Sequence, residues 1–211
     1  MILYLDTTTS YLYAALFENN KLIDSINVLL NKDLSENTLF MLNEMINNNG
    51  KSIEDIKKII IVNGPGSFTG IRIGLTISKT LAWAKNIPIV AISSLKAMSL
   101  SIIDDYDYVV PVIDARRDYY YASIYDKKTG LNVLKDQYIS KNALDVAIDN
   151  LPGSKVIVSN DDIKLEYEIK KYKPKFENII NNTMNNEESN PYYLDALYLK
   201  KTEAEENLNK W

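Results

Sequence analysis

Gly64-Pro65-Gly66-Ser67-Phe68-Thr69-Gly70-Ile71-Arg72-Ile73-Gly74 is the most informative stretch of this chain. An apolar β-branched run at residues 59–62 comes before it and predicts a buried strand, and residues 71–84 after it predict a helix. A strand, a glycine-rich turn and a helix can together direct backbone N–H groups toward an anion. The glycine spacing matches neither G-x-G-x-x-G nor G-x₄-G-K-[ST], however. The sequence therefore favours a packing role over a phosphate site.

Small residues recur every four positions along the predicted helix: Gly70, Gly74, Ser78 and Ala82. A second, larger apolar stripe runs beside them through Ile73, Ile77, Leu81 and Ala84. A row of small side chains allows close helix packing, and glycine inside a helix is otherwise unfavourable. We expect one stripe to pack on the sheet and the small one on a second helix. That helix belongs either to this chain or to a partner.

The composition excludes several kinds of catalytic site. None of the 211 residues is histidine or cysteine, so His/Cys zinc sites and Ser-His-Asp or Cys-His nucleophiles are excluded. Carboxylate pairs, Ser-Lys arrangements and Mg²⁺ held by aspartate remain open. The net charge of −4 argues against a free-standing nucleic-acid binder.

The hydropathy and the start of the chain predict a cytoplasmic protein. Residues 1–6 lack the basic region of a signal peptide, and no apolar run approaches the length of a membrane span. The absence of cysteine agrees with a reducing compartment.

The first part of the chain predicts three strands followed by a helix. The strands are expected at residues 2–6, 11–17 and 22–28, and the helix from Ser35 to near Gly50. The helix positions expected to face inward are Leu34, Thr38, Met41, Leu42, Met45 and Ile46. Phe40 points away from that face, either as a lone surface aromatic residue or as part of a contact surface.

The second half of the chain repeats this opening. At an offset of 108 residues, Asp6, Tyr11, Tyr13 and Ala14 match Asp114, Tyr119, Tyr121 and Ala122. Both segments read as strand, polar turn and strand, which favours a duplicated α/β unit over a chance match. Helices are expected at residues 142–150 and 163–172, and a polar surface loop at residues 178–190.

Three groups of polar residues are candidates for chemistry. Asp6, followed by three threonines, either ends a strand or handles Mg²⁺ and nucleotide phosphates, although no glycine follows it. Residues 114–118 (Asp-Ala-Arg-Arg-Asp) form either a salt-bridged turn or a functional patch, beside Tyr119, Tyr120 and Tyr121. Asp104, Asp105 and Asp107 are expected in a solvated loop rather than a metal site.

The stretch from Gly64 to Gly74 resembles the signature of the TsaB (YeaZ) family of bacterial tRNA threonylcarbamoyladenosine biosynthesis proteins. Residues 2–8, 112–116 and 196–205 resemble the same family. The resemblance implies a duplicated actin-like ASKHA (ribonuclease H-like) α/β fold, with two lobes of mixed sheet and helices. The lobes are expected at residues 1–105 and 106–195, followed by a C-terminal segment at residues 196–211.

The resemblance also implies a function. Proteins of this family are non-catalytic scaffolds that activate TsaD, with the ATPase TsaE completing the complex, in threonylcarbamoylation of adenosine 37 of tRNAs reading codons that begin with A. TsaD binds metal through paired histidines, which this chain lacks, so no catalytic residue, cofactor or metal site is carried over. We expect a TsaD heterodimer and indirect contact with tRNA, and the isolated chain is either a homodimer or a monomer.

By the same resemblance the partner interface lies on the two helices of the first lobe. The expected interface residues are Thr38, Met41, Leu42, Met45, Gly70, Ile71, Gly74, Leu75, Ser78 and Ala82. The alternative function is an ASKHA-type kinase or ATPase that uses Asp6 and Mg²⁺. A peptidase is disfavoured because histidine and cysteine are absent.

Overall fold

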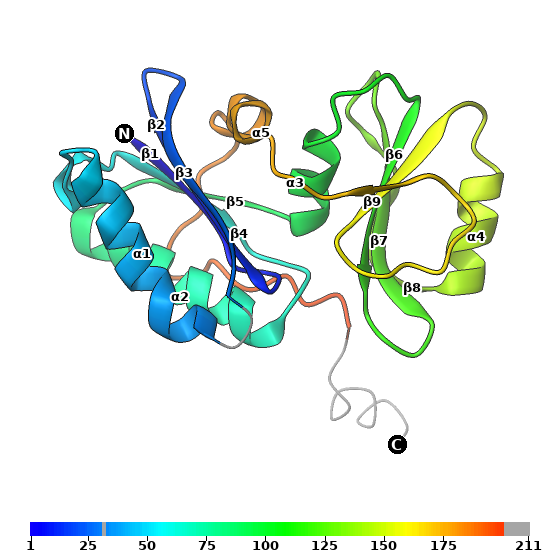
Figure 1. The fold of residues 1–211 in the computed structure, drawn as a ribbon, viewed down its shortest axis with the longest axis horizontal. Helices are drawn as coiled ribbons and strands as arrows, with labels where there is room; N and C mark the ends of the chain where they lie inside the picture. Colours follow the sequence, from blue (N-terminus) through cyan, green and yellow to red (C-terminus); the bar gives the residue numbers. More distant parts are fainter. Residues whose placement is uncertain (31–32, 201–211) are drawn as a thin grey trace. The chain divides into compact units, whose positions relative to one another are not determined.

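The computed structural model describes residues 1–30 and 33–200. The chain divides into two compact units (Figure 1). The first comprises Met1–Ile103 and Lys173–Ala196, and the second comprises Asp104–Tyr172 with residues 197–200. No helix among the described residues is long and apolar enough to cross a membrane.

The first unit is built on a five-stranded mixed sheet in the order β3-β2-β1-β4-β5. Its strands are β1 (Ile2–Asp6), β2 (Tyr11–Glu18), β3 (Lys21–Leu29), β4 (Lys58–Val62) and β5 (Ile89–Ile92). β1 pairs antiparallel with β2 and parallel with β4, which in turn is parallel to β5. The strands nearest the centre are almost completely buried because helices cover both faces of the sheet.

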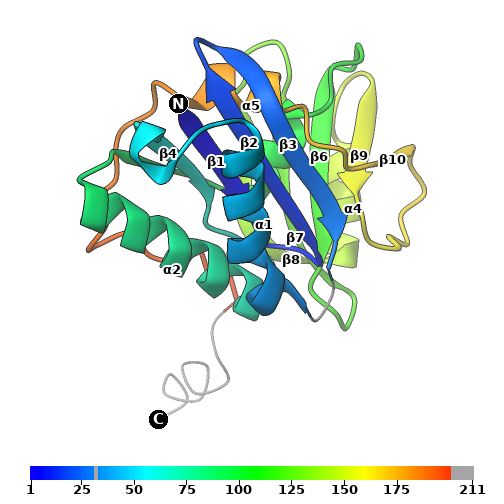
Figure 2. The same ribbon diagram turned by 60° about the vertical axis from the view of Figure 1, so that its left-hand side comes forward.

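The helices of the first unit cover opposite faces of this sheet (Figures 1 and 2). α1 (Leu34–Asn48) and α2 (Phe68–Lys85) pack on the face that carries Leu3 and Leu5, and a short 3₁₀ turn, η2 (Ile53–Asp55), follows α1. α3 (Ser94–Leu100) and α5 (Phe176–Thr183) pack against each other. Tyr4, which alternates with Leu3 and Leu5, meets Phe176 of α5 edge to face on the other side.

The second unit has the same strand topology. Its sheet runs β10-β9-β6-β7-β8, formed by β6 (Tyr108–Asp114), β7 (Tyr119–Asp126), β8 (Asn132–Ser140), β9 (Lys155–Ser159) and β10 (Ile169–Lys171). β6 is antiparallel to β7 and parallel to β9, as β1 is to β2 and β4. α4 (Lys141–Asp149) packs Leu144 and Ile148 into the core of this unit.

The predicted duplication is confirmed by these two sheets. β2 and β7 begin and end 108 residues apart, at the offset that the sequence match predicts. The two copies differ between their last two strands. α2 connects β4 to β5, whereas the described residues between β9 and β10 form no helix.

Some segments differ from the sequence-based expectations. The helix expected at residues 163–172 is absent, because Ile169–Lys171 pairs with β9 as β10. The loop expected at residues 178–190 instead begins inside α5, whose Phe176, Ile179 and Ile180 are buried at helical spacing. Residues 173–195, expected in the second lobe, pack with the first unit.

The small-residue stripe of α2 faces the sheet. A Cβ atom added to Gly74 would lie 2.5 Å from Thr7 Oγ1 and 3.2 Å from Ile61 Cδ1, and one added to Gly70 would lie 2.0 Å from the Thr7 carbonyl oxygen. The expected helix–helix role of this stripe is therefore wrong. The small residues let α2 approach the ends of β1 and β4, while Ile73, Ile77 and Leu81 stay partly exposed.

This packing predicts that Gly74→Ala destabilises the protein by about 1–3 kcal/mol, the usual range for overpacking. Thr7 would have to move, and its hydroxyl group donates to the Gly70 carbonyl oxygen at 2.7 Å. In a Thr7→Ala background, Gly74→Ala should be less destabilising. Urea unfolding of the four proteins of this double-mutant cycle measures the coupling, and strictly additive effects would contradict the close approach.

Candidate protein-binding groove

The end of β1 is the place where the sequence suggests nucleotide chemistry, and it is filled by the chain itself. The backbone N–H and the hydroxyl group of Thr8 both donate to Asp6 Oδ1, at 2.8 and 2.7 Å. The Ser67 N–H donates to the Thr8 carbonyl oxygen at 2.7 Å. A Cβ atom on Gly66 would lie 2.2 Å from that same carbonyl oxygen. The glycine-rich turn thus closes over the backbone of residues 7 and 8.

Asp6 is 1% exposed, and desolvation raises the pKa of its carboxyl group to about 6 against the opposing effect of the two Thr8 hydrogen bonds. Among the residues that the structure describes, no group of three or more aspartate or glutamate side chains is placed to hold a metal ion. The geometry here is that of a buried structural carboxyl group.

The other polar candidates take local partners. Asp104 Oδ2 pairs with Lys170 Nζ at 2.9 Å, and Asp107 Oδ2 accepts hydrogen bonds from the Ser154 N–H and hydroxyl groups. Asp114 is exposed at the end of β6, and its Oδ1 accepts from the Arg116 N–H at 2.9 Å. These carboxylates stabilise loops of the second unit.

The predicted interface residues are mostly inside the first unit. Met41 is half-buried, and the other nine are buried within this chain: Thr38, Leu42, Met45, Gly70, Ile71, Gly74, Leu75, Ser78 and Ala82. A side chain already covered by its own sheet cannot line an outer surface. The expected residues lie on the inward faces of α1 and α2.

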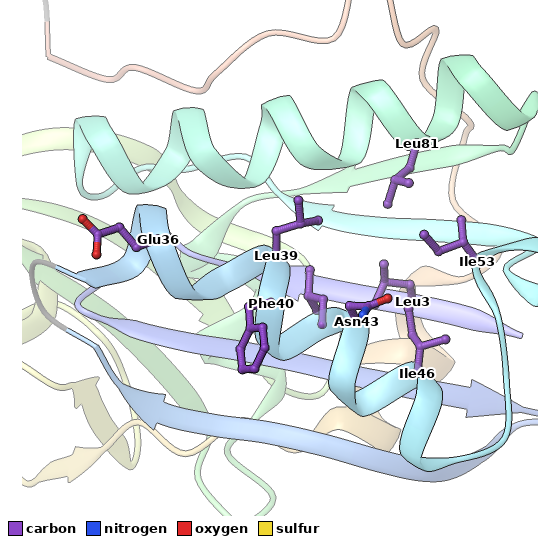
Figure 3. A pocket seen from close by; sticks show the side chains of 9 residues that line it. Leu3, Glu36, Leu39, Phe40, Asn43, Ile46, Ile53 and Leu81 are labelled. Carbon is purple, nitrogen blue, oxygen red and sulfur yellow. The ribbon is translucent and has the colours of Figure 1, made fainter.

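An open apolar groove lies at the same two helices and extends from their exposed side chains to buried residues of the core (Figure 3). Its volume is about 500 Å³, and its walls come from α1, α2, η2 and the start of β1. The lining residues are Leu3, Glu36, Leu39, Phe40, Leu42, Asn43, Ile46, Ile53 and Leu81. Leu39 and Phe40 are 58% and 59% exposed on α1. Leu81 extends from α2 toward the side of α1 that carries Leu39 (Figure 3).

Sequence reasoning missed most of this groove. Of the lining residues only Leu42 was among the expected interface residues. The available signal was Phe40, which departs from the inward pattern of α1. Two adjacent large apolar residues, Leu39 and Phe40, on the polar side of a helix indicate a contact surface.

Comparison with known proteins places the chain in a family. The model of the TsaD family, tRNA N6-adenosine threonylcarbamoyltransferase, matches residues 28–186. The chain belongs to the TsaD family.

The relatives named TsaB confirm the resemblance seen in the sequence. The TsaB protein of Bacillus subtilis is 36% identical over 140 residues, which cover 65% of this chain and 61% of the relative. The TsaB protein of Escherichia coli is 30% identical over 128 residues, which cover 60% of this chain and 55% of the relative. The matched region thus spans somewhat more than half the length of these two relatives.

A solved structure confirms the predicted two-lobed, actin-like fold of this TsaD-family chain. YeaZ from Pseudomonas aeruginosa matches with a TM-score of 0.76 at 21% identity, over 94% of this chain and 99% of that one. A second structure, of a protein described as similar to peptidase YeaZ from Pseudomonas aeruginosa, matches with a TM-score of 0.78 at 19% identity.

The buried carboxyl group of Asp6 predicts a defined pH dependence. Its pKa is raised from 3.8 to about 6 on folding, so the native state binds the proton more tightly and this group lowers the stability as pH rises from about 4 to 6. The full effect is about 3 kcal/mol. Asp6→Asn keeps an oxygen for the two Thr8 donors and should remove this loss. Its stability relative to wild type, measured by urea unfolding, should rise by about that amount between pH 4 and 7.

Asp114→Asn, at the equivalent exposed position of the second unit, is the matched control for the loss of one carboxylate. Parallel pH profiles for the two variants would contradict the assignment of a raised pKa to Asp6.

Proposed function

We propose that this chain is a non-catalytic subunit that binds a TsaD protein through the groove between α1 and α2. The complex it serves would transfer a threonylcarbamoyl group to adenosine 37 of tRNAs that read codons beginning with A. The observation that carries the proposal is the apolar groove with its exposed Leu39 and Phe40. The names of the TsaB relatives support the pathway.

The groove has the chemistry of a protein interface. Burying a leucine or phenylalanine side chain completely stabilises a complex by about 1.5–3 kcal/mol. Leu39 and Phe40 are a little more than half exposed, so covering them contributes on the order of 1–2 kcal/mol each. Aromatic anchors in a concave apolar patch are typical hot spots of such interfaces.

The non-catalytic role is supported by the residue inventory and by the end of β1. The chain lacks the histidines through which, by family resemblance, TsaD binds metal. The alternative function, an ATPase or kinase, requires Asp6 to reach Mg²⁺ at a nucleotide. Asp6 is buried and holds Thr8, while Gly66 and Gly70 bring backbone into van der Waals contact with residues 7 and 8.

The remaining partners follow from the same proposal. TsaE would join the larger complex, and tRNA would be held mainly by TsaD because this chain has a net charge of −4. A homodimer of the isolated chain would cover the same groove and compete with TsaD. Because its proposed partners act on tRNA, we propose that the protein works in the cytoplasm.

Binding is tested by co-purification with the TsaD relative from the same organism. Phe40→Asp should weaken the complex at least tenfold, because binding would bury a charged carboxylate that has no cation or hydrogen-bond donor to replace its hydration. Val146→Asp is the matched control, because Val146 is 60% exposed on α4 of the second unit. Equal loss in both variants, or none in either, would contradict the groove as the binding site.

The catalytic assignment is tested by reconstitution with purified TsaD, TsaE and tRNA. Leaving this chain out should abolish modification, whereas adding it as Asp6→Asn should restore the full rate. The isolated chain should not hydrolyse ATP. ATP turnover that disappears in Asp6→Asn would favour the kinase or ATPase alternative.

A further inference from the structure

The turn between β6 and β7 has an unusual backbone. Arg116, Arg117 and Asp118 have φ angles of 67°, 56° and 58°, so three consecutive residues other than glycine lie in the left-handed region. Such conformations are unfavourable by about 1 kcal/mol or more each and persist only where the surroundings hold them. Here the Ala115 N–H donates to the Tyr119 carbonyl oxygen at 2.9 Å, and the Lys141 N–H donates to that of Asp118 at 2.8 Å.

The turn presents two unpaired guanidinium groups. Arg116 and Arg117 are both exposed, and neither side chain has an ion pair or hydrogen bond with any residue in the described part of the chain. The nearby carboxylates serve backbone groups instead, since Asp114 Oδ1 accepts from the Arg116 N–H and Asp161 Oδ2 from the Asp114 N–H. The expected salt-bridged turn is thus absent. Guanidinium groups in this state are suited to bind phosphate.

Three tyrosine rings lie beside the turn on one face of β7 and β8. Tyr119 and Tyr121 are two residues apart on β7, so their side chains lie on the same face of the sheet. Tyr121 is paired with Tyr138 of β8. The Tyr119 and Tyr138 rings are stacked with their centroids 4.6 Å apart, and the Tyr121 ring is tilted 5.8 Å from Tyr138. Lys200 Nζ lies 5.5 Å from the Tyr138 ring centroid. Tyr119, which is 39% exposed, lies two residues after Arg117, with Asp118 between them.

We infer that this turn and its tyrosines bind unpaired RNA, with a base stacked on Tyr119 and the adjoining phosphates held by Arg116 and Arg117. Aromatic stacking next to positive charge is the usual chemistry of single-strand recognition. A simple anion would need no aromatic surface, and an apolar partner would need no arginines. Duplex RNA keeps its base faces covered. The inference is independent of the proposed binding of TsaD and adds a direct RNA contact to a chain whose net charge predicts only indirect contact.

The test uses the full chain and a short single-stranded RNA that carries 2-aminopurine, at low salt. Stacking on Tyr119 should quench the 2-aminopurine fluorescence. Arg116→Gln with Arg117→Gln should weaken binding at least tenfold and reduce the slope of log affinity against log salt by about 1.4, as expected for two phosphate contacts to a single strand. Tyr119→Ala should weaken binding at least fivefold, and Tyr119→Phe should retain it.

The matched control for charge is Lys128→Gln with Lys135→Gln, which removes two exposed cations from the same unit. The control for the ring is Tyr193→Ala, since Tyr193 is 82% exposed in the other unit. Equal losses in test and control variants would overturn the site. Binding of AMP alone as tight as that of the RNA, or equal binding of a duplex, would overturn the assignment to single-stranded RNA.

Discussion

The first unit depends on the close approach of α2 to the end of β1. Gly66, Gly70 and Gly74 leave no room for a side chain between the helix and residues 7 and 8. With the small residues on the sheet side of α2, its large residues Ile73, Ile77 and Leu81 remain partly exposed, and Leu81 lines the groove together with residues of α1. The groove is therefore a consequence of glycine packing on the opposite side of the same helix.

The same contact explains why Asp6 is buried while Asp114, at the equivalent position of the second unit, is exposed. Asp6 is sealed where the turn before α2 closes over the end of β1. Asp114 ends the matching strand of the second unit, where no helix connects β9 to β10 within the described residues, and it stays exposed. Loss of one covering helix converts a buried strand end into an open turn that can carry charge.

Much of the fold could be predicted from the sequence because its signals are local. The period of α1, the apolar run of β4 and the repeated opening at Tyr11 and Tyr119 each identify an element or its copy.

The groove could not be predicted in the same way. Small residues at Gly70 and Gly74 suit close packing on a helix or on a sheet, and periodicity does not distinguish the two. In the structure Gly70 and Gly74 pack against Thr7 at the end of β1, a residue more than 60 positions earlier in the chain, which the local pattern does not identify. The helix expected at residues 163–172 failed for a related reason, since pairing of β10 with β9 is a tertiary contact.

The duplicated unit accounts for two surfaces of opposite chemistry in one chain. In the first unit the covering helices bury the polar strand end and expose leucine and phenylalanine, which favours a protein partner. In the second unit the strand end is open, and the strained turn exposes Arg116 and Arg117, which form no ion pair with a described carboxylate. Backbone strain of this kind clusters at functional sites. A turn with glycine would relieve the backbone but would lose the two arginines that stand two and three residues before Tyr119.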